Sequence, residues 1–354
     1  MKHGLKGLKT TALIAGIALA GATFSSARAD ETVTYASWGG VTQEAIVTKL
    51  FDGADKIGVN IRNERAGGWA GVKAHLNAGA PGWDLTDVGL GRCEEVSLAK
   101  QIVPVDYSIV DKSKVPAHLA QPDYVGVFTF SYGITYQTEK YGENGPKTWA
   151  DFFDVKKFPG SRSMLGNGLY ALEAALAADG VPVKDVYKVL KAPGGVDRAF
   201  KKLEEIKPHV KVWWRSSGQA MQLVRDGEVD MAIFPNGRAF ALVKEGSKIT
   251  YIWNQGFIDV ACYIVPKTAA NPTGAFKLIN LALDPGNQAR FAAQIGYGPV
   301  NPDSFRLDIL SKEQMDWLPT SPQNVDKQAW VDPTWSASRQ NQDAMLRFSK
   351  FLQE

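Results

Sequence analysis

Aromatic, arginine and acidic side chains recur where the predicted strands and turns of this chain end. They are Trp38, Trp69, Arg92, Tyr132, Trp214, Arg215, Asn236, Phe257 and Asp259. Open α/β sheets bind ligands just beyond the carboxyl ends of their strands. Aromatic faces attract ammonium groups by about 0.5 to 2 kcal/mol each, and arginine binds carboxylates in a bidentate manner. This set therefore predicts a site for a small charged organic ligand.

Several of these residues also have a purely structural interpretation. Trp213 and Trp214 should point to opposite faces of a strand, so one of them belongs to the core, and alternation does not say which. Arg215 is either a surface residue or an anion ligand, because the polar helix start that follows it favours negative charge. Asp259 stands before an apolar strand, where an unpaired carboxylate is costly to bury, which favours a cationic partner.

The elements that must position these residues alternate between strands and helices. Strands are predicted at 32–36, 59–61 and 84–89, with helical patterns between them, which is the rhythm of βαβ units around a parallel sheet. The extended aromatic stretch 128–136 is a candidate crossing between two lobes. Beyond it we expect helices from Thr148, at 218–226, from Asn271-Pro272 and at the C-terminus. Further strands are expected at 211–214, 229–234, 248–253 and 259–265.

Composition excludes several classes of protein. The chain has 354 residues, 45% of them hydrophobic and 22% charged, with two Cys and four His. It is therefore not a disordered chain, a disulfide-stapled miniprotein or a strongly cationic nucleic-acid binder. Nucleophile-elbow, HExxH, CxxC and phosphate-loop motifs are absent, and His75, His118 and His209 lack metal-ligand spacing. We expect no catalytic residues, metal or cofactor, although a carboxylate pair from distant segments would still make a secreted enzyme.

Residues 1–29 are predicted to be a cleavable export signal. A basic start is followed by the apolar run 10–24 and by Ala27-Arg28-Ala29 before Asp30. The run is too short to span a bilayer, so the mature protein is expected in the periplasm. Loss of Lys2, Lys6, Lys9 and Arg28 changes the formal charge from +3 to −1. The apparent basicity then implies no polyanionic partner.

Three stretches together resemble a known family. These are Tyr35-Ala36-Ser37-Trp38-Gly39-Gly40, the segment 228–240 with Phe234-Pro235-Asn236-Gly237-Arg238, and the segment from Asp259 to Ile295-Gly296-Tyr297-Gly298-Pro299. In order and spacing they resemble the solute-binding proteins of bacterial ABC importers, in the spermidine/putrescine-binding group. The resemblance covers essentially the whole mature chain.

The resemblance implies a two-lobed type II periplasmic binding protein fold with a hinge and a ligand cleft. The first lobe would comprise 30–132 and about 260–312, and the second about 133–259 and about 313–354. Trp38 is similar to the family's first-lobe aromatic wall, Asp259 to the acid that takes a ligand amine, and Phe257 to a stacking partner. Tyr297 matches the tyrosine of the Gly-Tyr turn, and Asn236 lies in a cleft-facing turn.

The chain departs from polyamine-binding members at the start of a second-lobe helix. Asn167 and Tyr170 stand where those members carry acidic residues, which weakens the case for a long di- or triamine. Arg215, together with Arg92 or Arg238, instead suggests a carboxylate on the ligand. A zwitterion such as 4-aminobutyrate would place its amine at the negative Asp259 and its carboxylate at the positive Arg215, so it would pair with both charges.

The expected partner is an inner-membrane ABC permease, and the protein is expected to be a monomer. A sensor that presents its closed form to a chemoreceptor is the alternative in another functional class. An iron carrier would need an adjacent tyrosine pair, which the chain lacks. Cys93 and Cys262 both fall in the first lobe and form either a disulfide or two buried thiols.

Overall fold

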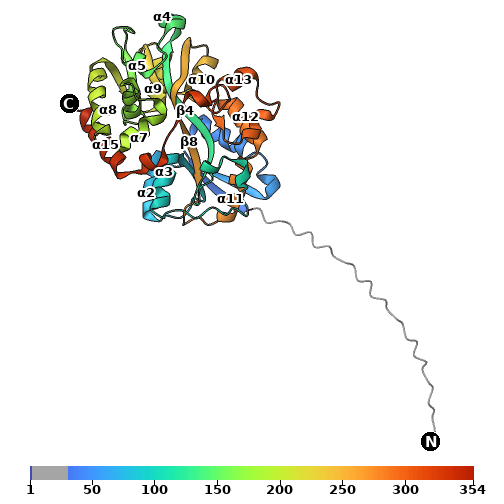
Figure 1. Cartoon of the computed structure of the whole chain (residues 1–354). Coiled ribbons are helices and arrows are strands. Elements are labelled where there is room, and N and C mark those ends of the chain that lie inside the picture. The colour runs from blue at the N-terminus through green and yellow to red at the C-terminus, as the bar shows by residue number, and fades with distance from the viewer. Residues whose placement is uncertain (2–30) are drawn as a thin grey trace.

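The computed structural model describes Met1 and residues 31–354. The predicted export signal, apart from Met1, lies outside the described residues. Figure 1 shows a mixed α/β molecule in which β4 and β8 run through the centre, from the part that contains α2 and α11 to the part that contains α5 and α9. None of the helices among residues 31–354 has the length and hydropathy of a membrane span.

A ten-stranded sheet extends through both lobes. Its main path has the order β2-β1-β3-β8-β4-β7-β5-β6, with β10 beside β8 and β9 beside β4. The outer strands of each lobe pair in parallel, as the βαβ pattern predicts, whereas β4 and β8 pair antiparallel with their neighbours β3 and β7 and with each other. The strands are β1 (Glu31–Ser37), β2 (Val59–Arg65), β3 (Leu85–Gly89), β4 (Val125–Gln137), β5 (Arg162–Leu165), β6 (Val210–Trp214), β7 (Met231–Pro235), β8 (Ile249–Ile264), β9 (Gly298–Pro299) and β10 (Ala329–Trp330).

Helices cover the sheet in both lobes. In the first half of the chain they are α1 (Gly40–Ala45), α2 (Gly68–Ala78), α3 (Leu90–Leu98), α4 (Thr138–Tyr141), α5 (Trp149–Phe153) and α6 (Ala171–Ala178). The second half contributes α7 (Val186–Lys191), α8 (Gly195–Ile206), α9 (Ser217–Arg225), α10 (Asn236–Lys244), α11 (Pro272–Ala282), α12 (Pro285–Ile295), α13 (Lys312–Asp316), α14 (Pro333–Ala337) and α15 (Arg339–Phe351).

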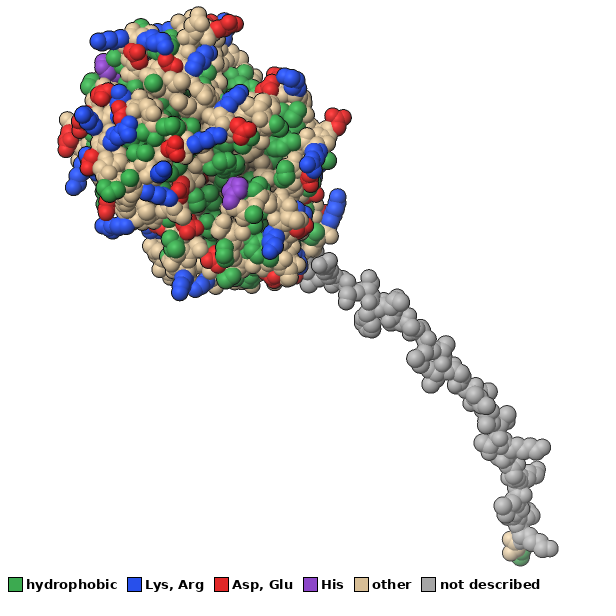
Figure 2. All heavy atoms as spheres, viewed as in Figure 1, with side chains coloured by type: hydrophobic (Ala, Val, Ile, Leu, Met, Phe, Trp, Pro, Cys, Tyr) green, Lys and Arg blue, Asp and Glu red, His purple; other side chains and the backbone are tan. Residues whose placement is uncertain are grey.

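Two large apolar cores define the lobes. The first-lobe core draws its buried members from residues 33–128 and 260–300, and the second-lobe core from 134–257 and 329–351. A small third cluster forms around α12 and the segment up to Leu318. On the face that Figure 2 shows, side chains of both charges are interspersed around a central apolar area, which agrees with a net charge near zero.

The chain crosses between the lobes along β4 and β8. The register between these strands slips between Tyr132 and Ile134, where residues 253–256 of β8 bulge, and Gln255 in the bulge has a φ of 63°. The prediction of two strands at 248–253 and 259–265 is therefore wrong in one respect. They form a single strand, because the pairing with β4 resumes on both sides of the bulge.

Helix starts follow the predicted caps. Thr148 accepts a hydrogen bond from the Asp151 amide, and the Asp151 carboxylate accepts from the Thr148 amide in return. Asn271 caps α11 through the Gly274 amide, with Pro272 in the first turn. Ser216 caps α9. The two cysteines form a disulfide, Cys93–Cys262, which joins the first turn of α3 to β8.

Candidate functional site

One face of β4 and β8 presents aromatic and acidic side chains at the junction of the lobes. Alternate residues of a strand share a face, so Phe128, Phe130 and Tyr132 point to the same side of β4. In the antiparallel register Tyr132 pairs with Phe257, and Phe130 pairs with Asp259. The two predicted residues Phe257 and Asp259 therefore lie on that same face, beside Tyr132.

Asp259 is a half-buried carboxylate that no cation pairs among the described residues. Its Oδ2 atom accepts a hydrogen bond from the Tyr170 hydroxyl at 2.8 Å, and its Oδ1 atom accepts from the Val260 amide at 2.7 Å. Burial raises the pKa of Asp259, while these hydrogen bonds and the more distant charge of Arg92 oppose the rise. A partly buried carboxylate without an ion pair is stabilised when a cation binds beside it.

Stacked rings form one wall next to Asp259. Tyr170 stacks on Tyr132 with ring centroids 4.4 Å apart and lies parallel to Phe257 at 6.1 Å, which in turn stacks on Trp149 at 5.6 Å. Tyr170 caps α6 with a φ of 60°, a conformation that a bulky residue rarely adopts. Tyr170 belongs to the second-lobe core, whereas Asp259 precedes Val260, a member of the first-lobe core, so their hydrogen bond lies at the boundary between the two cores.

A second wall carries the guanidinium of Arg238, at the start of α10. Tyr297 stacks on Phe128 at 5.6 Å and packs against Gly237, where a Cβ atom would lie 2.3 Å from the Tyr297 ring. Burial raises the pKa values of Tyr132 and Tyr297, and the positive charge of Arg238 opposes both rises. The charge of Arg238 therefore acts on both phenols. Among residues 31–354 its side chain has no ion pair.

Glu173 is a buried acid that the sequence interpretation missed. It lies in the first turn of α6, three residues after Tyr170, and is 7% exposed. Burial raises the pKa of Glu173 to about 7, the Tyr187 hydroxyl beside it opposes the rise, and the charge of Asp259 adds to it. One signal in the sequence could have found this residue, namely a single acid inside the apolar run Ala171 to Ala178.

Arg92 and Trp69 contact each other on the first lobe. The Arg92 guanidinium lies over the Trp69 ring, 4.9 Å from its centroid, and donates to Glu95 Oε2 at 2.9 Å. Lys73 bonds the other oxygen of Glu95 at 2.7 Å. Arg92 therefore already has an anionic partner, unlike Arg238.

The described contacts do not connect the remaining predicted residues to Asp259. Trp38 is 50% exposed and packs against Gly68. Asn167 and Arg215 are exposed, and Trp214 is buried with its indole N–H unpaired. Asn236 is fully buried: its oxygen accepts from the Ser131 amide at 2.9 Å, and its nitrogen donates to the Gly296 and Trp317 carbonyls. The side-chain amide of Asn236 therefore links β4 to the backbone at Gly296 and at Trp317.

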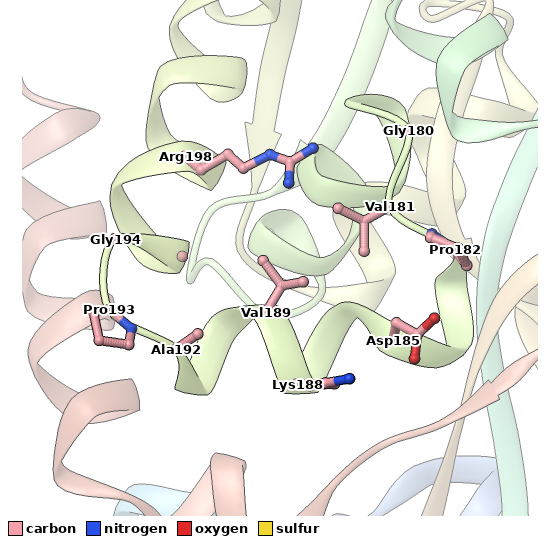
Figure 3. A pocket seen from close by; sticks show the side chains of 11 residues that line it. Gly180, Val181, Pro182, Asp185, Lys188, Val189, Ala192, Pro193, Gly194 and Arg198 are labelled. Carbon is pink, nitrogen blue, oxygen red and sulfur yellow. The ribbon is translucent and has the colours of Figure 1, made fainter.

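A surface groove on the second lobe lies away from this cluster. Figure 3 shows it between α7 and α8, with Val181, Val189 and the Arg198 side chain around the hollow. Arg198 pairs with Asp179 at 2.6 Å. None of the predicted ligand-binding residues lines this groove, so the junction of the lobes is the stronger candidate site.

Two lobes joined by shared strands, with charged and aromatic side chains at their junction, are typical of proteins that bind a small solute. Residues 47–317 match the model of the bacterial extracellular solute-binding proteins. The chain belongs to this family, which confirms the family and the fold expected from the sequence.

Relatives with known names agree. The chain is 34% identical over 331 residues to the gamma-aminobutyric acid-binding protein of Pseudomonas aeruginosa, with 89% of this chain and 92% of the relative covered. It resembles the crystal structure of an ABC transporter substrate-binding protein from Bradyrhizobium japonicum with a TM-score of 0.85, 37% identity and coverage of 91% and 99%. The MotA binding protein of A. tumefaciens, solved with glucopine, gives a TM-score of 0.83 at 31% identity, with the same coverage.

Proposed function

We propose that this protein is the periplasmic component of an ABC importer and captures a zwitterionic amine of the 4-aminobutyrate type. The ammonium group of the ligand binds at Asp259, and its carboxylate binds at Arg238. The rings of Tyr132, Tyr170 and Tyr297 enclose the carbon atoms of the ligand between these two groups. The closed form then delivers the ligand to a membrane permease. The ligand leaves chemically unchanged, a proposal supported by relatives that are named as binding proteins.

The observation that carries this proposal is that two opposite charges, neither with an ion-pair partner among residues 31–354, flank one aromatic wall. Asp259 lies opposite Phe130 of β4, and Arg238 follows Gly237, which packs against Tyr297. The charge of Asp259 raises the pKa of Tyr132, and the charge of Arg238 lowers it. Both groups therefore act on the same side chain, while neither has an ion-pair partner among the described residues. A ligand that carries one positive and one negative group satisfies both, and its bidentate contact with arginine adds geometric selectivity.

The same charges argue against a polyamine. A diamine or triamine that placed one ammonium at Asp259 would bring a second one toward the Arg238 guanidinium, and like charges repel. The relative that this chain matches over most of its length is named for gamma-aminobutyric acid, which supports the zwitterion. Glucopine belongs in the ligand panel because a structural relative was solved with it.

Titration calorimetry tests the proposal with 4-aminobutyrate, putrescine, spermidine and glucopine. We expect 4-aminobutyrate to bind and both polyamines to bind much more weakly. Asp259→Asn and Arg238→Gln should each weaken binding of 4-aminobutyrate by at least about tenfold, since each removes a charge-assisted hydrogen bond. Mass spectrometry of the released ligand should show no chemical change, which separates a binding protein from an enzyme.

Arg215→Gln serves as the matched variant for Arg238→Gln. Arg215 is exposed, and the geometry predicts no effect on binding. A loss of affinity in Arg215→Gln with none in Arg238→Gln would move the carboxylate subsite to the start of α9, as the sequence suggests. Unchanged affinity in both Asp259→Asn and Arg238→Gln would refute the proposed function. Ligand uptake by cells that lack this protein would distinguish import from sensing, because uptake falls if the protein serves a permease and is unchanged if it serves a chemoreceptor.

A further inference from the structure

Two helices from different lobes pack against each other beside the proposed amine site. Helix α3 belongs to the first lobe, because Leu90, Cys93 and Val96 are members of the first-lobe core. Helix α14 belongs to the second lobe, because Trp335 is buried in the second-lobe core. The two helices are neighbours in the fold, and in Figure 1 α3 lies where the two parts of the molecule meet.

Gly91 of α3 leaves no space for a side chain at this contact. A Cβ atom at position 91 would lie 2.2 Å from the Cβ atom of Ser336 and 3.5 Å from its Cα atom. Carbon atoms in contact are normally about 3.5 to 4.0 Å apart, so the missing Cβ atom allows α14 to come this close to α3. The backbone does not itself require glycine, since Gly91 is helical and has no positive φ.

Helix α14 is attached to the rest of the second lobe on its other sides. Asp332, the N-cap of α14, forms an ion pair with Lys191 of α7 at 2.5 Å, and Gln340 donates to the Leu190 carbonyl at 2.9 Å. The Ser336 hydroxyl donates to the Asp332 carbonyl at 3.0 Å, within its own helix. A displacement of α14 away from α3 therefore moves the second lobe with it.

The start of α3 is attached to the first lobe and lies against Asp259. The disulfide between Cys93 and Cys262 joins α3 to β8. A Cβ atom at Gly89, directly before α3, would lie 3.7 Å from the Oδ2 atom of Asp259. Gly91 is thus two residues away from a backbone position that contacts the carboxylate of the proposed amine site.

We infer that the contact between Gly91 and Ser336 determines how far the lobes close on the ligand, and that Gly91 is a positioning residue for ligand affinity. Periplasmic binding proteins close around their ligands by hinge motion, and a ligand that binds the closed form better shifts the population toward it. A methyl group at position 91 would hold the two helices about 1 Å further apart and so favour the open form. The inference rests on the proposed function for its ligand, whereas lobe closure can also be measured without one.

Calorimetry with 4-aminobutyrate compares the wild type, Gly91→Ala, Ser336→Gly and the double variant. We expect Gly91→Ala to raise the Kd at least about tenfold. The Tm of ligand-free Gly91→Ala should stay within about 2 °C of the wild type, because opening of the lobes relieves the close contact. Ser336→Gly removes the opposing Cβ atom, so the double variant should bind within about threefold of Ser336→Gly alone.

Small-angle X-ray scattering of the ligand-free proteins gives a second measurement. Gly91→Ala should have a larger radius of gyration than the wild type, and the double variant should return to the radius of Ser336→Gly. Gly145→Ala is the matched control, because its Cβ atom would lie 2.4 Å from the Tyr136 ring within the second lobe. This control should lower the Tm and change neither the Kd nor the radius.

An unchanged Kd in Gly91→Ala, or a raised Kd that Ser336→Gly does not restore, would overturn the inference and leave the proposed function intact. Failure of Gly91→Ala to fold would also overturn it, since the contact would then be needed in every state of the protein. If the wild type bound none of 4-aminobutyrate, putrescine, spermidine and glucopine, the proposed function would be refuted. The radii alone would then decide the inference, and equal radii of the wild type and Gly91→Ala would overturn it.

Discussion

The buried carboxyl of Glu173 should make the ligand-free protein less stable at neutral pH. Its pKa rises from an ordinary 4.5 to about 7 in the folded protein, a difference worth about 3 kcal/mol at 1.36 kcal/mol per unit. A raised acid pKa means that the folded state holds the proton more tightly than the unfolded chain. The cost is therefore absent below about pH 4.5, grows between pH 4.5 and 7, and is fully present above pH 7.

Glu173→Gln removes this cost while nearly preserving side-chain shape. We expect the variant to unfold at a Tm about 4 °C above that of the wild type at pH 8, given the unfolding entropy of a chain of this size. At pH 4 the two proteins should unfold at the same temperature. Differential scanning calorimetry of ligand-free protein across pH 4 to 8 measures the difference. Glu204→Gln, at an exposed glutamate of α8, serves as the control and should follow the wild type throughout. The reasoning would be refuted if Glu173→Gln had a lower Tm than the wild type at pH 8, or if its Tm differed from that of the wild type by the same amount at every pH.

Two further predictions concern the disulfide and the packing of Gly237 against Tyr297. Cys93→Ser with Cys262→Ser should lower the free energy of unfolding by about 3 to 5 kcal/mol, because the bond joins residues 169 positions apart; denaturant unfolding with and without dithiothreitol measures this, and equal midpoints would contradict it. Gly237→Ala should cost about 1 to 3 kcal/mol and weaken ligand binding, since its Cβ would lie 2.3 Å from the Tyr297 ring. Gly218→Ala, which meets nothing within 4 Å, should instead add up to about 1 kcal/mol of stability; thermal unfolding compares the two, and a larger loss in Gly218→Ala would contradict the packing argument.

The sequence predicted correctly those helix starts that depend on side chains and amides only a few residues apart. The caps at Thr148 and Asn271 act through side chains and amides three residues apart, so a single sequence contains all the information. The family resemblance also named Phe257 and Asp259, which the pairing of β8 with β4 brings beside Tyr132. The single strand β8 was predicted as two, because the bulge depends on pairing with β4, more than a hundred residues away.

Residues whose role depends on distant neighbours could not be identified in this way. Glu173 appears in the sequence as one acid on a helix, and its burial without an ion pair among residues 31–354 depends on how the elements around α6 pack. Asn236 stands in a turn that suggests a cleft contact, yet its amide bonds three backbone groups from β4 and from the segments at Gly296 and Trp317. The choice between Arg92, Arg215 and Arg238 likewise requires knowledge of which guanidinium has a carboxylate beside it.

The hydrogen bond from Tyr170 to Asp259 has a consequence for discrimination between ligands. The phenol already offers Asp259 a neutral donor, so a ligand hydroxyl that replaced it would exchange one hydroxyl–carboxylate hydrogen bond for another and gain almost nothing. An ammonium ion gains in addition the attraction between opposite charges, about 1 kcal/mol or more. The Tyr170 hydroxyl thus competes with the ligand for Asp259. Alcohols of the same shape as the amine gain too little binding free energy to replace it.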